Sequence, residues 1–298
     1  MQAVQFRAYG SPDVLDVVDT SEPVAPAGGV LIRVIASGVN GLDAILRQGF
    51  MAEQMPVEFP AGVGLEASGE VLAVGEGVTG TAVGDVVFGF GAATAAEKAV
   101  LVTWAAVPAT VDPIEAGGWA VAIETAGRVL TLLAPAEGST VLVSGASGGV
   151  GTALVQLAVA RGLRVIGTAS EANQERVTAL GATAVVYGDG LADRVRATAP
   201  EGVSAAFDLA GSGIVPELIE IVGDASHVIS IADFSAPEHG ARVSTSQTEA
   251  DPAASFAEAI AIDGFGIPVA ATFPLARAGE AQELVAGKHS GGKVLLVP

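Results

Sequence analysis

The chain has 298 residues, half of them hydrophobic and 16% charged, which is typical of a folded globular protein long enough for two domains. Its formal net charge of −19 argues against nucleic acid and anionic membrane surfaces as partners. Cysteine is absent, which excludes disulfides, thiolate metal sites, iron–sulfur clusters and a cysteine nucleophile.

The remaining metal-ligating and targeting signals are weak. The histidines His227, His239 and His289 have no further ligand at short spacing, so we expect structural or surface roles for them and no metal site. No apolar run approaches the roughly 20 residues of a membrane-spanning helix. The N-terminus alternates like a strand and lacks the basic start and apolar block of a signal peptide. We therefore expect a cytoplasmic protein with no membrane partner.

The first hundred residues are predicted to be rich in β-strands. Short apolar runs at 30–35, 70–74 and 85–88 are separated by glycine and proline turns. Glycines are especially dense between 62 and 84. This pattern favours a small, tightly turned barrel.

From about residue 112 the hydrophobic period changes to a strand–helix alternation. The first helical stretch is 113–133, with an interruption near 117–118, and a later one is 171–180. The strands expected after the stretch 113–133 are 141–144, 164–168, 184–187, 205–209 and 227–231. This rhythm predicts a parallel sheet with right-handed crossovers. The tail adds a helix at 252–262 and strands at 268–273 and 293–297.

A glycine-rich turn joins the strand at 141–144 to a helical stretch. Glycines occur at 145, 148 and 151, directly before small and apolar residues at helical spacing. Such a turn brings bare backbone and the free N–H groups of a helix start close to a dinucleotide pyrophosphate. We therefore expect cofactor contacts from Ser147, Gly148, Gly149 and Val150.

The end of the following strand indicates which dinucleotide is preferred. NAD sites usually carry an acidic residue there, but this chain has Ser170, with Asn173 and Arg176 after it. These residues suit a 2′-phosphate, which favours NADP; Glu171 is the counter-evidence. Alternatively, Ser170 is a helix N-cap and Arg176 a solvated side chain.

Further cofactor contacts are expected from residues that follow the later strands. Asp208 is expected to brace its loop more than to meet a ligand. For Tyr187, core or surface packing is as plausible as cofactor contact. The remaining candidates are Ala210, Ile231, Phe234 and Lys293.

Four segments together resemble the zinc-independent quinone oxidoreductases, the ζ-crystallin group of the medium-chain dehydrogenase/reductase superfamily. They span nearly the whole chain in the family's order. The segments are 36–49, with its Gly-Val-Asn-x-x-Asp and Arg-x-Gly motifs, 60–87, the nucleotide loop 141–151, and the terminal strand at 292–296.

The resemblance implies an α/β protein with a GroES-like β-barrel domain, 1–112 and 265–298, and a Rossmann nucleotide-binding domain, 113–264. The active site would lie in the cleft between them. Zinc alcohol dehydrogenases of the superfamily have cysteine where this chain has Asn40 and histidine where it has Leu65, so the resemblance implies a metal-free site. The chain is short for the family, with abbreviated segments at 89–97 and 234–264.

The expected reaction is hydride transfer from NADPH to a quinone or to the β-carbon of an activated enone. Asn40 and Thr125 are the candidates for contacts around the nicotinamide and the acceptor oxygen, with the proton coming from solvent. Alternatively, Asn40 stabilises a turn and Thr125 caps a helix. Two other functions stay open: an NADPH-binding redox sensor or stable protein with little turnover, and an enoyl-thioester reductase. The resemblance also implies a homodimer.

Overall fold

A computed structural model describes residues 1–245, 250–287 and 291–298, so the expectation for His289 lies outside the described residues. The chain forms two compact units, Met1–Val121 with Gly266–Pro298 (unit 1) and Ala122–Phe265 (unit 2). The first division falls after residue 121 rather than after 112, because the short helix α2 (Pro113–Ala116) packs on strands of unit 1.

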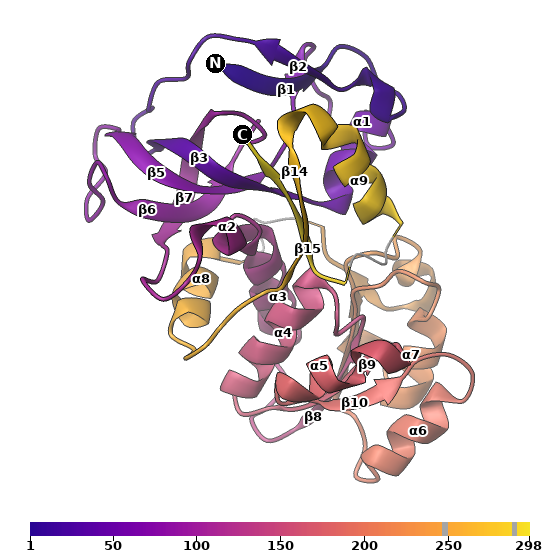
Figure 1. The fold of residues 1–298 in the computed structure, drawn as a ribbon. Helices are drawn as coiled ribbons and strands as arrows, with labels where there is room; N and C mark the ends of the chain where they lie inside the picture. The colour runs from indigo at the N-terminus through magenta and orange to yellow at the C-terminus, as the bar shows by residue number, and fades with distance from the viewer. Residues whose placement is uncertain (246–249, 288–290) are drawn as a thin grey trace. The chain divides into compact units, whose positions relative to one another are not determined.

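Unit 1 contains a closed antiparallel barrel. Its strands are β3 (Val30–Val39), β5 (Glu66–Val74), β6 (Val86–Gly91) and β7 (Lys98–Ala106), and β3 pairs with β7 to close it (Figure 1). Alternate apolar residues point inward along each strand. The barrel core consists of Val30, Ile32, Val34, Ala67, Val71, Val87, Ala99 and Leu101.

The C-terminal segment returns to unit 1 and extends this sheet. It supplies β14 (Val269–Pro274), α9 (Ala278–Ala286) and β15 (Lys293–Val297), and β15 runs antiparallel to β3. A smaller sheet holds the remaining strands, and α1 packs against α9. Their bounds are β1 (Gln2–Phe6), β2 (Asp16–Asp19), β4 (Ala61–Gly62) and α1 (Gly41–Gln48).

Unit 2 is built on a parallel sheet of six strands in the order β10-β9-β8-β11-β12-β13. Numbered from β8, this is the order 3-2-1-4-5-6 of dinucleotide-binding folds, in which ligands bind at the carboxyl ends near the strand where the order reverses. The strands are β8 (Thr140–Ser144), β9 (Arg164–Ala169), β10 (Thr183–Val186), β11 (Ala205–Asp208), β12 (Val228–Ser230) and β13 (Arg242–Val243).

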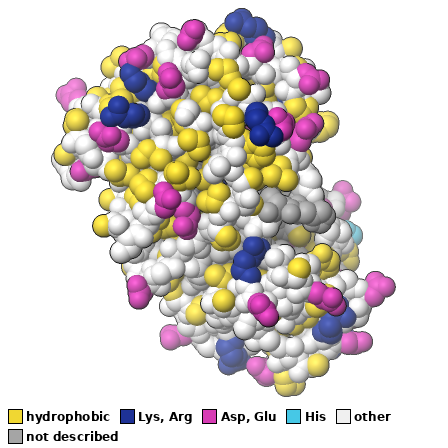
Figure 2. All heavy atoms as spheres, in the orientation of Figure 1, with side chains coloured by type: hydrophobic (Ala, Val, Ile, Leu, Met, Phe, Trp, Pro, Cys, Tyr) yellow, Lys and Arg dark blue, Asp and Glu magenta, His cyan; other side chains and the backbone are white. Residues whose placement is uncertain are grey.

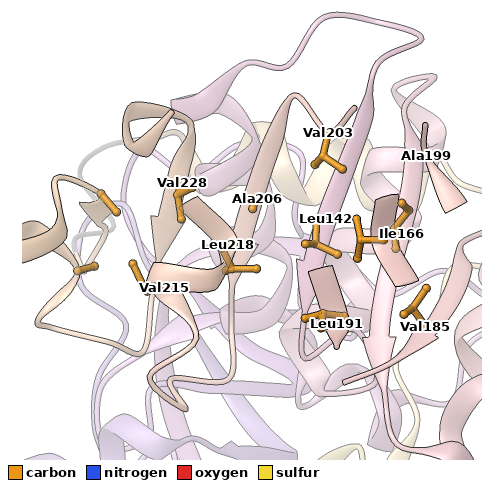
Figure 3. Close-up of a cluster of buried hydrophobic side chains, with 13 residues drawn as sticks. Leu142, Ile166, Val185, Leu191, Ala199, Val203, Ala206, Val215, Leu218 and Val228 are labelled. Carbon is orange, nitrogen blue, oxygen red and sulfur yellow. The ribbon is translucent and has the colours of Figure 1, made fainter. Parts of the chain in front are cut away.

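Helices pack on this sheet and bury its apolar side chains. Strand residues such as Leu142 and Ile166 meet Leu191 of α6 and Leu218 of α7 in one cluster (Figure 3). Each of these four side chains is at most 2% exposed. The helices of unit 2 are α4 (Gly149–Ala160), α5 (Gln174–Ala179), α6 (Leu191–Thr198), α7 (Val215–Val222) and α8 (Pro252–Ile260), and α3 (Trp119–Leu133) enters it from unit 1.

The structure confirms the predicted change from barrel to strand–helix alternation, including the helix interruption at 117–118. The sixth strand, β13, has only two residues and was not predicted. Within the described residues, no helix has both the length and the apolar character to cross a membrane. On the face drawn in Figure 2, basic side chains lie scattered among acidic ones.

Candidate functional site

The glycine loop of unit 2 joins the end of β8 to the start of α4. Gly148 is the N-cap, and Gly149 and Val150 form the first turn, whose N–H groups have no acceptor within the helix. A Cβ atom on Gly151 would lie 2.1 Å from the carbonyl oxygen of Gly145, so only glycine fits there. Because glycines occupy these positions, the backbone of the loop is not covered by side chains and can come close to a phosphate.

Arg176 of α5 lies over this loop. Its guanidinium donates a hydrogen bond to the carbonyl oxygen of Ser147, and partial burial lowers the pKa of Arg176. The alternative of a freely solvated Arg176 is therefore wrong. The contact brings a positive charge to the loop, where a phosphate group would be attracted to it.

The carboxyl end of β9 is polar and uncharged. Asn173 Nδ2 donates to Ser170 Oγ at 3.1 Å, and the side chain of Ser170 makes no capping bond to the 3₁₀ turn that follows. Glu171 is exposed. This neutral pair, followed by Arg176, suits a 2′-phosphate better than it suits a free ribose 2′-hydroxyl.

Asp208 braces the ends of two neighbouring strands, as the sequence suggested. Its buried carboxylate accepts the N–H groups of Ala210 and Gly211, each at 3.1 Å, and the hydroxyl of Ser230 at 2.7 Å. Ile231 donates its N–H to the carbonyl oxygen of Asp208. The backbone at Ala210 and Ile231 is thus fixed at the carboxyl edge of the sheet.

Two expected contact residues are exposed aromatics. Tyr187 directly follows β10 and is 51% exposed, and Phe234 is 58% exposed in the stretch after β12. Packing in the core is therefore excluded for both side chains.

Unit 1 carries a second cluster, around Asn40. The β15–β3 register places Val294 opposite Val39, so Lys293 comes beside Asn40. Lys293 Nζ lies 2.7 Å from Asn40 Oδ1 and 2.7 Å from Glu66 Oε1, and Asn40 Nδ2 donates to Glu66 Oε1 at 2.8 Å. The side chains of Lys293 and Glu66 are 7% and 0% exposed. The cluster is therefore a buried ion pair that holds one amide.

The surroundings of Glu66 explain why this carboxylate is tolerated. Its second oxygen accepts the N–H of Val121, in the first turn of α3, at 2.8 Å. A helix N-terminus favours negative charge. A Cβ atom on Gly38 would lie 2.3 Å from Glu66 Oε1, so a glycine on the neighbouring strand leaves room for the side chain.

Asp43 is a second acidic residue near this cluster. Its Oδ2 accepts the backbone N–H of Asn40 at 2.7 Å, which fixes the start of α1. Burial, together with the nearby charge of Glu66, raises the pKa of Asp43 to about 6. The carboxyl lines a cavity of about 100 Å³ whose other walls are mostly apolar.

Thr125 lies in the middle of α3 and is 7% exposed. Its hydroxyl lies 3.4 Å from Glu124 Oε2, and Glu124 forms a buried ion pair with Arg128. The helix-capping alternative for Thr125 is therefore wrong. Asn40 is the N-cap residue of α1 and forms a capping box with Asp43, so the alternative that Asn40 stabilises a turn holds, and its amide also contacts Glu66 and Lys293.

Two sequence profiles match the chain in order. Residues 26–130 match the alcohol dehydrogenase GroES-like domain, and residues 149–252 match the zinc-binding dehydrogenase profile. A rat quinone oxidoreductase (Rattus norvegicus) is 36% identical over 61% of this chain and 57% of its own length. The chain belongs to the quinone oxidoreductase branch of the medium-chain dehydrogenase/reductase superfamily.

Other members of the superfamily match the full chain. The chloroplastic NADPH-dependent alkenal/one oxidoreductase of Arabidopsis thaliana is 28% identical over 100% of this chain and 80% of its own length. A mycobacterial protein whose structure is complexed with NADPH is 29% identical, with a TM-score of 0.81 and full coverage of both chains. The matches to the rat enzyme and to a second quinone oxidoreductase, from Lama guanicoe, span little more than half of those relatives' length. The predicted family and fold class are confirmed.

The profile name raises the question of zinc in this member of the superfamily. Among the described residues, no group of three or more His, Cys, Asp or Glu side chains is arranged to hold a metal ion. The oxygens of Asn40 and Glu66 face the ammonium of Lys293 at 2.7 Å. A second cation there would be repelled, so the residues present do not fit zinc.

Sequence reasoning missed most of the unit 1 cluster. Glu66 and Asp43 occur within the family motifs, but no role was predicted for either of them. Lys293 was predicted to contact the cofactor. The available signal was a glutamate within the glycine- and alanine-rich run 61–69, since a charge buried in such a segment needs a partner. The partner, Lys293, lies more than two hundred residues away in the sequence.

Proposed function

We propose that this protein is an NADPH-dependent, metal-independent oxidoreductase that transfers hydride to a quinone or an activated enone. The observation that carries the proposal is Arg176, whose guanidinium lies on the glycine loop at Ser147 and follows the neutral pair Ser170–Asn173. A cation beside a phosphate-binding loop distinguishes NADPH from NADH by charge.

The cofactor end of the proposal rests on unit 2. The N–H groups of Gly149 and Val150 would bind the pyrophosphate, with Gly148 as the glycine that lets it come close, and Arg176 with Ser170 and Asn173 would bind the 2′-phosphate. Backbone at Ala210 and Ile231, with Phe234 and Tyr187, would contact the rest of the dinucleotide. When bound, the dihydronicotinamide supplies the hydride.

The acceptor end rests on unit 1. Asn40 uses one amide N–H for Glu66, and among the described residues its second N–H has no partner. We propose that this N–H donates to the acceptor oxygen as negative charge develops there, with Thr125 as a further contact. The proton that completes a hydroquinone or an enol then comes from water.

The names of the relatives support the same acceptor class, since they include quinone oxidoreductases and an alkenal/one oxidoreductase. We propose further that the protein is a cytoplasmic homodimer. Light scattering of the purified protein tests the dimer, and fractionation of cells tests the location.

The decisive experiment titrates the protein with NADPH and NADH by fluorescence and then follows NADPH oxidation with quinones and enones. We expect tighter binding of NADPH than of NADH, and turnover with at least one acceptor class. Equal affinity for the two cofactors would contradict the role of Arg176. Tight NADPH binding with no oxidation by any acceptor would favour a redox sensor or stable protein.

Reduction of an enoyl thioester is the second catalytic candidate. It would require a basic site for coenzyme A phosphates, but the chain has only 14 Lys and Arg residues against 33 Asp and Glu. Including crotonyl-coenzyme A in the acceptor panel tests this candidate directly. A lower KM for the thioester than for any quinone or free enone would replace the proposed acceptor class.

A further inference from the structure

The Asn40 amide has charged groups on both of its polar atoms. Its oxygen faces the Lys293 ammonium at 2.7 Å, and its nitrogen faces the Glu66 carboxylate at 2.8 Å. The two charged side chains are almost wholly removed from solvent. Water therefore screens these interactions very little.

These charges select one orientation of the amide. An ammonium group has only donors, and an ionised carboxylate has only acceptors. Rotating the amide by half a turn would place its N–H groups against Lys293 and its oxygen against Glu66. Both contacts would then be repulsive, so the cluster prevents the flip.

We propose that Lys293 is a positioning residue that acts through Asn40, holding the amide so that its second N–H stays directed to the acceptor oxygen. The effect on turnover rests on the proposed function, whereas the orientation of the amide does not. This role differs from the cofactor contact that the sequence suggested for Lys293. The ammonium of Lys293 supplies the positive charge of this cluster, which does not fit zinc.

A purely structural ion pair would behave differently from a positioning cation. A buried pair often contributes little net stability, although removing one partner leaves an uncompensated charge and is strongly destabilising. Replacing both partners with neutral side chains of similar size should therefore restore folding. If the cation positions Asn40, that double replacement should not restore turnover.

The orientation of the amide can be read by NMR without any turnover. The chain contains only two asparagines, Asn40 and Asn173, so selective ¹⁵N labelling gives two side-chain amide pairs. We expect Lys293→Met to shift the Asn40 pair and to speed its hydrogen exchange, while the Asn173 pair in unit 2 stays unchanged. An unchanged Asn40 pair would overturn the proposal.

The matched control is Lys98→Met. Lys98 also forms an ion pair, with Glu22 at 2.6 Å, but its side chain is 28% exposed. None of the contacts described for Lys98 is with Asn40. This variant should leave both asparagine signals and NADPH oxidation unchanged.

Kinetics test the consequence for the reaction. We expect Lys293→Met to lower kcat by about tenfold or more, as loss of a supporting hydrogen-bond partner does at other sites, with NADPH affinity unchanged. The double variant Glu66→Gln with Lys293→Met should regain thermal stability and keep the low kcat. Recovery of wild-type kcat in the double variant would make the pair purely structural and overturn the proposal.

Two further outcomes are informative. If Lys293→Met weakened NADPH binding and left kcat intact, the cofactor contact would replace the positioning role. If the single variant did not fold, the same NMR measurement on the double variant decides, since its Asn40 pair should still be altered. A wild-type protein inactive with every acceptor would refute the proposed function, while the NMR result would still decide the role of Lys293.

Discussion

The glycine loop of unit 2 and the Asn40 cluster of unit 1 differ in how their polar groups are brought together. The loop is continuous in sequence, nearly free of charged side chains, and presents backbone N–H groups at a helix start. The cluster collects Asn40, Glu66 and Lys293 from distant parts of the chain and buries the charges of Glu66 and Lys293. A backbone site depends on local geometry, whereas a side-chain site depends on strand register and can therefore hold a fixed charge.

The largest expected effect comes from breaking the local geometry of the loop. Gly151→Val should abolish NADPH binding, because its side chain would meet the carbonyl oxygen of Gly145 and force the loop apart. Isothermal titration calorimetry measures the loss. Gly287→Ala at the end of α9 is the control substitution, since its Cβ would stay 3.4 Å from the nearest atom and the position lies outside the loop. Full NADPH affinity in Gly151→Val would contradict the role of close packing.

The two asparagines sharpen the comparison, because each unit contains one. Asn40→Ala should lower kcat by about 10² to 10³, as loss of a donor to a developing oxyanion does, with NADPH binding retained. Asn173→Ala should instead raise KM for NADPH and leave kcat close to wild type. Steady-state kinetics with varied NADPH measures both. The reverse assignment of the two effects would refute the division of roles between the units.

Arg176 tests the charge of the loop. Arg176→Met should weaken NADPH binding by about 10- to 100-fold, equivalent to about 1.4–2.7 kcal/mol, and change NADH binding much less. Fluorescence titration with the two cofactors gives the ratio of dissociation constants. The exposed Arg277, which pairs with Glu280, provides a control substitution of the same kind in unit 1. An equal loss for both cofactors would indicate a purely structural Arg176.

The smallest effect concerns Asp43 and stability. Burial raises its pKa from 3.8 to about 6, so the folded protein binds more protons than the unfolded chain between these pH values. The free energy of unfolding therefore contains a contribution from Asp43 that is fully present below pH 3.8 and is lost as pH rises through 6. Relative to Asp43→Asn, the wild type should lose stability over this range, as measured by urea unfolding. A difference independent of pH would contradict the raised pKa.

Local sequence signals were enough for most of unit 2. The glycines at 145, 148 and 151, the polar strand end at Ser170 and the strand–helix rhythm depend on neighbours within a few residues, and the structure confirms the elements that they predicted. The two-residue strand β13 was missed because so short a strand carries no period of its own.

The cluster around Asn40 was outside the reach of such signals. The sequence by itself determined that there are two kinds of domain, a glycine-rich loop between a strand and a helix, and no cysteine for a thiolate metal site. Only the tertiary structure decided that Lys293 pairs with Glu66 and holds Asn40, and that Arg176 reaches Ser147. The reason is that backbone propensities act between neighbouring residues, whereas a buried charge finds its partner only when strand register fixes which distant side chains meet.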